Sequence, residues 1–147
     1  MENDQILQAM RLELECYRSL AKLTKTQHEC IQNSRSGELL AVLGKRQQFL
    51  REITKLRQIS AVARRNWAEF IAQLPAEQRR EAESLHLETR HLIEQIAAAD
   101  RDDTLVMQQR KLNVGKKINQ ATSARKFNRA YAAAAYGQGK PGLDIHR

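Results

Sequence analysis

The sequence predicts an all-α protein: an antiparallel, coiled-coil-like bundle of three long helices followed by a flexible C-terminal tail. Of the 147 residues, 41% are hydrophobic but only 5% are aromatic. This composition is thin for a compact globule and typical of long helices packed side by side. Six glycines and two prolines leave few places for turns. Apolar residues also recur at intervals of three and four, the repeat of a helix that buries one face.

The first helix is expected over about residues 3–33. Its apolar face steps through Leu7, Met10, Leu14, Tyr17, Ala21, Thr24, His28 and Ile31. Residues 34–37, Ser-Arg-Ser-Gly, should end it. Glycine accepts the left-handed conformation of a helix C-cap, and serine can cap the free amides of the following helix.

The second helix is expected over about residues 38–74. Its face continues through Leu39, Val42, Arg46, Phe49, Ile53, Leu56, Ser60, Ala63, Trp67, Phe70 and Leu74. The face is widened by Leu43, Leu50, Ile59 and Ile71, so we expect this helix to be central and to contact two neighbours. Pro75 should end it, because proline has no amide to donate and restricts the residue before it to extended conformations.

The third helix is expected over about residues 76–136, a length of roughly 90 Å at ~1.5 Å per residue. The second helix spans roughly 55 Å, so the end of the third should extend past its neighbours. A break near residues 100–104 stays open, since Asp-Arg-Asp-Asp-Thr could cap a new helix. Residues 1–136 would then form a single bundle domain and the glycine-containing residues 137–147 a flexible tail.

Beyond residue 103 the helical repeat gives the third helix two apolar faces. Val114 falls in the sector of Leu85 and Ile96 and is expected to serve the bundle itself. Leu105 and Leu112 lie on the opposite side, which predicts a surface for a partner helix. The residues predicted to bind a partner are Leu105, Leu112, Phe127, Asn128, Ala130, Tyr131, Ala134 and Tyr136.

The formal charge of +8 is unevenly distributed. Residues 75–103 contain eight acidic side chains against four arginines, whereas residues 104–143 contain no acidic residue. Arg125, Lys126 and Arg129 lie beside the predicted partner face and could steer an acidic partner towards it. A nucleic-acid-binding protein is an alternative, but it is disfavoured because the basic doublets are scattered around the helix. A structural coiled-coil scaffold is a second alternative.

The sequence contains no pattern that indicates catalysis, and we expect no catalytic residues, no cofactor and no metal. His86 and His91 are five residues apart, off the spacing that brings two imidazoles to one metal on a helix. Cys16 and Cys30 would lie roughly 20 Å apart on one helix and cannot pair. A secretion signal and a membrane span are absent, which favours a cytoplasmic location.

Residues 36–50, Ser-Gly-Glu-Leu-Leu-Ala-Val-Leu-Gly-Lys-Arg-Gln-Gln-Phe-Leu, resemble the family of the flagellar export chaperone FlgN. In that family the second helix of a helical bundle opens with a glycine, an acid and a leucine. The resemblance continues more loosely through Leu74 and Pro75. It ends with Asn119, Asn128, Tyr131 and Tyr136-Gly137-Gln138-Gly139.

This resemblance implies a non-enzymatic cytoplasmic chaperone. Such a protein binds the C-terminal helical part of hook-filament junction proteins, keeps them from polymerising and delivers them to a component of the flagellar export gate. It implies neither insertion into a membrane nor binding of nucleic acid. The identity of the cargo and the oligomeric state, a homodimer included, stay open.

Overall fold

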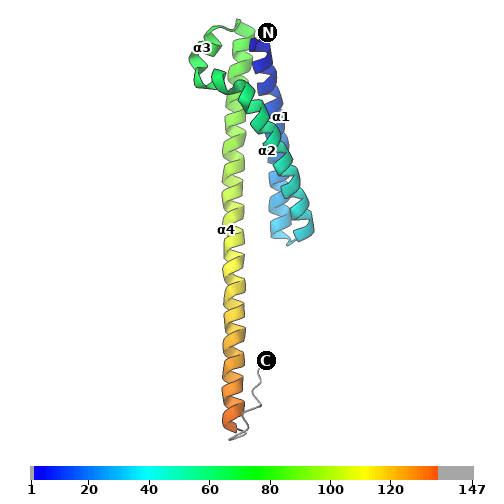
Figure 1. Ribbon diagram of the computed structural model, residues 1–147, viewed down its shortest axis with the longest axis vertical. Helices are drawn as coiled ribbons and strands as arrows, with labels where there is room; N and C mark the ends of the chain where they lie inside the picture. Colours follow the sequence, from blue (N-terminus) through cyan, green and yellow to red (C-terminus); the bar gives the residue numbers. More distant parts are fainter. Residues whose placement is uncertain (1, 136–147) are drawn as a thin grey trace. The chain divides into compact units, whose positions relative to one another are not determined.

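The computed structural model describes residues 2–135, with side chains as far as Lys126 and that of Arg129, and every element in this range is an α-helix. The helices are α1 (Glu2–Gln32), α2 (Ser36–Arg65), α3 (Trp67–Ala72) and α4 (Ala76–Ala135) (Figure 1). The all-α class is confirmed, but residues 2–135 form four helices and not three. Tyr136 and the predicted tail, 137–147, lie outside the described residues.

The chain divides into two compact units, Met1–Thr104 and Leu105–Arg147, and α4 contributes residues to both. Two clusters of buried apolar side chains form the core of the first unit. One joins Leu7 and Met10 of α1 to Phe70 of α3 and Leu85 of α4. The other joins Tyr17 of α1 to Ile53 of α2 and Ile96 of α4. The first unit therefore has a core of its own.

Ion pairs show that α1 and the first part of α4 run in the same direction. The Arg11 guanidinium donates to Glu81 on α4. Arg18 donates to Glu88 over 2.8 Å, at the same separation of 70 residues along the chain. Because the separation does not change along the helices, α1 and α4 are parallel to each other.

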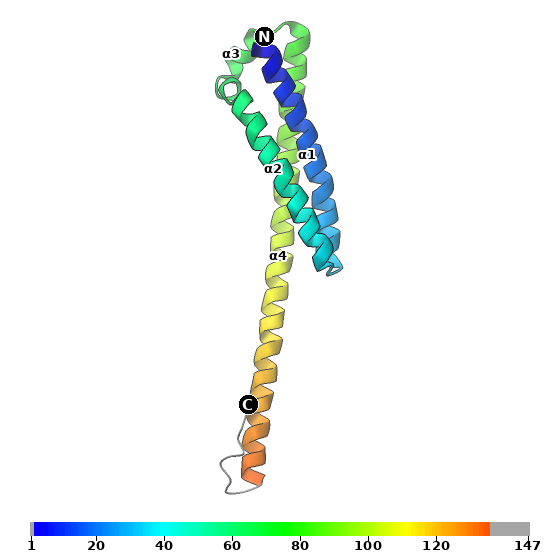
Figure 2. The same cartoon turned by 45° about the vertical axis from the view of Figure 1, so that its right-hand side comes forward.

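By the same criterion, α2 runs antiparallel to α1, as Figures 1 and 2 also show. Glu13 pairs with Arg64, 51 residues later. Thr24 accepts a hydrogen bond from Arg46, which is only 22 residues later. The separation falls as the two helices approach the turn that connects them, which is the pattern of a helical hairpin.

The sequence indicated that Gly37 takes the left-handed conformation in the turn between α1 and α2. In the structure, Ser34 takes it instead. Ser34 has a φ of 55°, in the left-handed region. Its amide donates to the carbonyl of Ile31 (3.3 Å), and the amide of Arg35 donates to that of Cys30 (2.9 Å). This pair of bonds is the Schellman motif, which satisfies the last carbonyls of a helix. Gly37 lies inside α2.

Asn66 divides the predicted second helix into α2 and α3. Its φ and ψ of −115° and 50° are not helical, and its amide donates to the carbonyl of Val62. Asparagine is a poor residue for a helix interior because its side chain competes for backbone hydrogen bonds. The expected helix over 38–74 is therefore wrong at this point. In contrast, α4 is unbroken through residues 100–104.

The central helix of the first unit is α1 and not α2. Twelve residues of α1 are buried, against five in α2. The buried side of α1 is wider than predicted, since it also includes Leu20 and Cys30, whereas His28 is exposed. On α2, the residues expected to widen the buried face are exposed instead: Leu43, Leu50 and Ile59. These three side chains are not covered, so α2 buries a narrower face than the sequence indicates.

Candidate partner-binding helix face

Large apolar side chains are exposed along the part of α4 that belongs to the second unit. Leu105 and Leu112 are 63% and 61% exposed, and Val114 and Ile118 are 55% and 59% exposed. Met107 is also exposed. Single exposed apolar residues are normal on a protein surface, but five within fourteen residues are a local concentration of the kind found where partners bind.

These side chains form two rows on opposite sides of the helix. At ~100° per residue, Leu105 and Leu112 lie within roughly 20° of each other and form the first row, called here the leucine row. Met107, Val114 and Ile118 lie on the other side and form the second row, called here the valine row. Val114 was expected to serve the bundle itself. That expectation is wrong, because its side chain is 55% exposed.

For most of the remaining residues of the predicted partner face, the structure describes the backbone alone. The backbone of Phe127, Asn128, Ala130, Tyr131 and Ala134 is helical, but their side chains lie outside what the structure describes, as does all of Tyr136. The three cations predicted to steer a partner, Arg125, Lys126 and Arg129, are exposed. On the helical repeat, Ala130 and Ala134 extend the leucine row, and Phe127 lies close to it.

The entire net charge belongs to the second unit. Residues 1–104 contain sixteen basic and sixteen acidic side chains, whereas residues 105–147 contain nine basic and one acidic. The single acidic residue is Asp144, so the helical residues 105–135 contain none. Two copies of this surface would repel each other, because like charges at short range disfavour association. The surface therefore favours a partner that is both apolar and acidic.

The first unit also contains a charged layer that the sequence did not predict. Glu13 is completely buried, and its Oε2 accepts a hydrogen bond of 2.8 Å from Arg64. Arg64 also donates to Ser60 (3.2 Å) and lies 3.2 Å from Nδ1 of His86. The His86 ring stacks on Trp67, with ring centroids 4.6 Å apart. Burial, and then the charges of Arg64 and Arg90, lower the pKa of His86, with an opposing contribution from Glu13.

A second polar layer explains why α4 does not break at its acidic residues. The carboxylate of Asp103 is buried and accepts a hydrogen bond of 2.9 Å from Gln27 on α1. It also lies 2.7 Å from Nδ1 of His28. Asp100 accepts a bond of 2.7 Å from Arg46 on α2. These carboxylates bind side chains of neighbouring helices, so they do not cap a new helix.

The surface carboxylates of α4 also bind across helices. Glu81 and Glu88 pair with Arg11 and Arg18 of α1 and not with arginines of their own helix. Each of these four side chains is more than a third exposed, so solvent weakens the interaction. Their main effect is to align the two helices.

Cys16 and Tyr17, two ionisable side chains of α1, have raised pKa values. Burial is the first cause that raises the pKa of the Cys16 thiol, and the nearby carboxylates of Glu52, Glu13 and Glu15 raise it further. Burial likewise raises the pKa of Tyr17. A thiol with a raised pKa is mostly protonated at neutral pH and is a weak nucleophile. Within the described residues, no three histidine, cysteine or acidic side chains are grouped so that they could hold a metal ion.

Comparison of the chain with known protein families, curated proteins and solved structures found no match. Among the helices of residues 2–135, none has both the length and the apolar character needed to cross a membrane.

Proposed function

We propose that this protein is a non-enzymatic, cytoplasmic export chaperone that holds an amphipathic helix of its client on the leucine row. The observation that carries the proposal is the exposure of Leu105 and Leu112, seven residues apart in the part of α4, residues 105–135, that contains no acidic residue. A client helix that presents apolar residues at intervals of three and four would bury these side chains. Acidic residues beside its apolar face would pair with the surrounding cations.

The identity of the client comes from the resemblance of residues 36–50 to FlgN. It implies that the client is the C-terminal helical part of a hook-filament junction protein and that delivery ends at a component of the export gate. A chaperone of this kind prevents assembly by covering the client's own polymerisation helix. The exposed apolar side chains of residues 105–118 and the positive charge of residues 105–135 support this role.

The test is the affinity of the full chain for such a helical segment, measured by fluorescence anisotropy. The double variant L105A/L112A should weaken binding at least tenfold. Covering a leucine contributes about 1.5–3 kcal/mol, and about 1.4 kcal/mol corresponds to a factor of ten. Alanine favours the helix, so the variant should keep its helical circular dichroism.

The matched control is V114A/I118A, which removes two aliphatic side chains of similar exposure from the opposite row. This control should change client affinity less than about threefold. Equal losses in the two variants would contradict a specific client face on the leucine row. Unchanged affinity in L105A/L112A would show that these leucines do not contact the client.

Nucleic-acid binding is the second candidate, and the nine basic side chains of residues 105–147 favour it. A protein that neutralises several phosphates loses affinity steeply as salt rises, with a slope of about −0.9 for each phosphate contact. Binding to random DNA with such a slope, unaffected by L105A/L112A, would support this function over the chaperone.

A further inference from the structure

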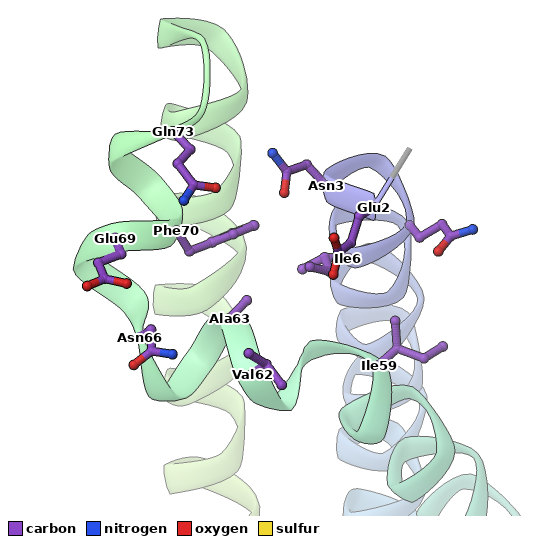
Figure 3. A pocket seen from close by; sticks show the side chains of 11 residues that line it. Glu2, Asn3, Ile6, Ile59, Val62, Ala63, Asn66, Glu69, Phe70 and Gln73 are labelled. Carbon is purple, nitrogen blue, oxygen red and sulfur yellow. The ribbon is translucent and has the colours of Figure 1, made fainter.

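A groove lies between the first turns of α1 and the bend between α2 and α3, entirely within the first unit (Figure 3). Its volume is about 380 Å³. The buried side chains of Ile6, Ala63 and Phe70 form its floor, and Figure 3 shows Ile6 and Phe70 pointing towards each other across it. The groove exists because the chain changes direction at Asn66, which carries α3 away from the line of α2.

The wall of the groove is apolar and open to solvent. Ile59 and Val62 line it, and they are 50% and 62% exposed. Water in contact with these side chains and with the apolar floor would be released if another apolar side chain entered. The groove therefore favours an occupant that presents aliphatic residues.

The rim of the groove is acidic. Glu2 of α1 and Glu69 of α3 line it from different helices, and the other polar lining residues are asparagine and glutamine. No lysine or arginine is among the lining residues. Neither carboxylate has an ion-pair partner in the described part of the chain. An occupant with cations on both sides of an apolar row would match this rim.

We propose that the groove binds the valine row of a second copy of this chain. Met107, Val114 and Ile118 present aliphatic side chains at spacings of seven and four and are exposed. On the helical repeat, Lys111 and Lys117 lie on the two sides of this row, and both are exposed. An apolar row between two cations therefore meets an apolar floor between two carboxylates.

Charge separates this contact from other contacts between copies. Two second units repel each other, because residues 105–135 contain cations and no acidic residue. The acidic groove attracts the same surface. The groove is small, so we expect weak association with a dissociation constant on the order of micromolar or higher. The client, proposed to bind the leucine row, uses the opposite side of the helix.

The first experiment is sedimentation velocity of the full chain over a range of concentrations, without a client. At about 0.05 M salt the chain should associate with rising concentration, and about 0.5 M salt should weaken association at least tenfold by screening. V114A/I118A should weaken association about tenfold, while L105A/L112A changes it less than about threefold. A chain that stays monomeric at every concentration and salt would overturn the proposal.

The second experiment tests the groove itself. E2Q/E69Q should weaken association about fivefold or more. The control E29Q/E83Q makes the same charge change on exposed carboxylates outside the groove and should change the association constant less than about twofold. Equal effects of the two variants would show a nonspecific charge effect and overturn the proposed site. The single tryptophan, Trp67, reports occupancy through its fluorescence, because its ring centroid is 5.7 Å from that of Phe70 in the groove floor.

A charge exchange gives the sharpest outcome. E2K/E69K alone should not associate, because its groove becomes basic, and K111E/K117E alone should not associate, because its valine row becomes acidic. An equal mixture of the two should associate again, since the basic groove of one variant meets the acidic row of the other. A mixture that stays monomeric, with both variants folded by circular dichroism, would refute this pairing. Client binding to the leucine row is measured separately, so either proposal can fail without the other.

Discussion

Replacing Arg64 by methionine should destabilise the first unit more than any change at its surface. Arg64 supplies the one hydrogen bond from another side chain that Glu13 receives, to Oε2 at 2.8 Å. The other oxygen, Oε1, is buried without a hydrogen bond, 3.4 Å from Nε of the half-exposed Arg57. Methionine keeps the length of the side chain but leaves a carboxylate in the core with this single distant cation. Breaking a buried pair in this way costs about 3–5 kcal/mol, a large part of the ~5–15 kcal/mol that stabilises a domain.

The assay is urea unfolding followed by circular dichroism, applied as a double-mutant cycle. Arg65→Met is the matched control, because it makes the same chemical change on the exposed neighbouring residue and should cost less than about 1 kcal/mol. The double variant R64M/E13L should recover most of the loss, since replacing both members of a buried pair by apolar residues is often neutral. A loss below about 1 kcal/mol in R64M would show that the contact between Arg64 and Glu13 is not important for the stability of the first unit.

Four further predictions concern folding. A chain that ends after Thr104 should still melt cooperatively, because both apolar clusters lie in residues 1–104; loss of most of its helicity would contradict this. Since the folded-state pKa of His86 is lowered, the unfolded chain binds its proton more readily. The free energy of unfolding should therefore be highest above about pH 6.5 and fall below it, and H86Q should reduce this dependence in urea titrations at several pH values. Trp67→Ala should cost about 2–3 kcal/mol, less than the ~3–5 kcal/mol of a fully buried ring, because Trp67 is only partly buried. Ser34→Gly should raise the unfolding free energy by about 0.5–1 kcal/mol in the same assay, as glycine adopts a positive φ without strain.

The fold class and most of the buried positions were predictable because they follow from local spacing. The face of α1 through Leu7, Met10, Leu14 and Tyr17 is buried as its interval of three and four indicates. Helical phase also separates Leu105 and Leu112 from the valine row. The phase cannot tell how far a neighbouring helix extends along the chain, so the exposure of Val114 could not be predicted.

The polar layers were not predictable because their partners are far away in the sequence. Glu13 looks like a surface residue beside Leu14, and its burial depends on Arg64, 51 residues later. The break at Asn66 was missed for a related reason. The apolar interval continues through Trp67 and Phe70 as if the helix were unbroken, and a single asparagine is a weaker signal than that repeat. The groove follows from this break and was not predictable for the same reason.

The two units differ in net charge, so salt should affect folding and association differently. The first unit is neutral overall and buries its critical charges in pairs, so salt should have little effect on its stability. The second unit contains nine basic side chains against one acidic and exposes its apolar rows beside them. Its association with an acidic client or an acidic groove should therefore weaken as salt rises. Salt can consequently separate folding from binding. If a salt concentration abolishes association while the unfolding midpoint stays constant, the charges that bind partners lie outside the core.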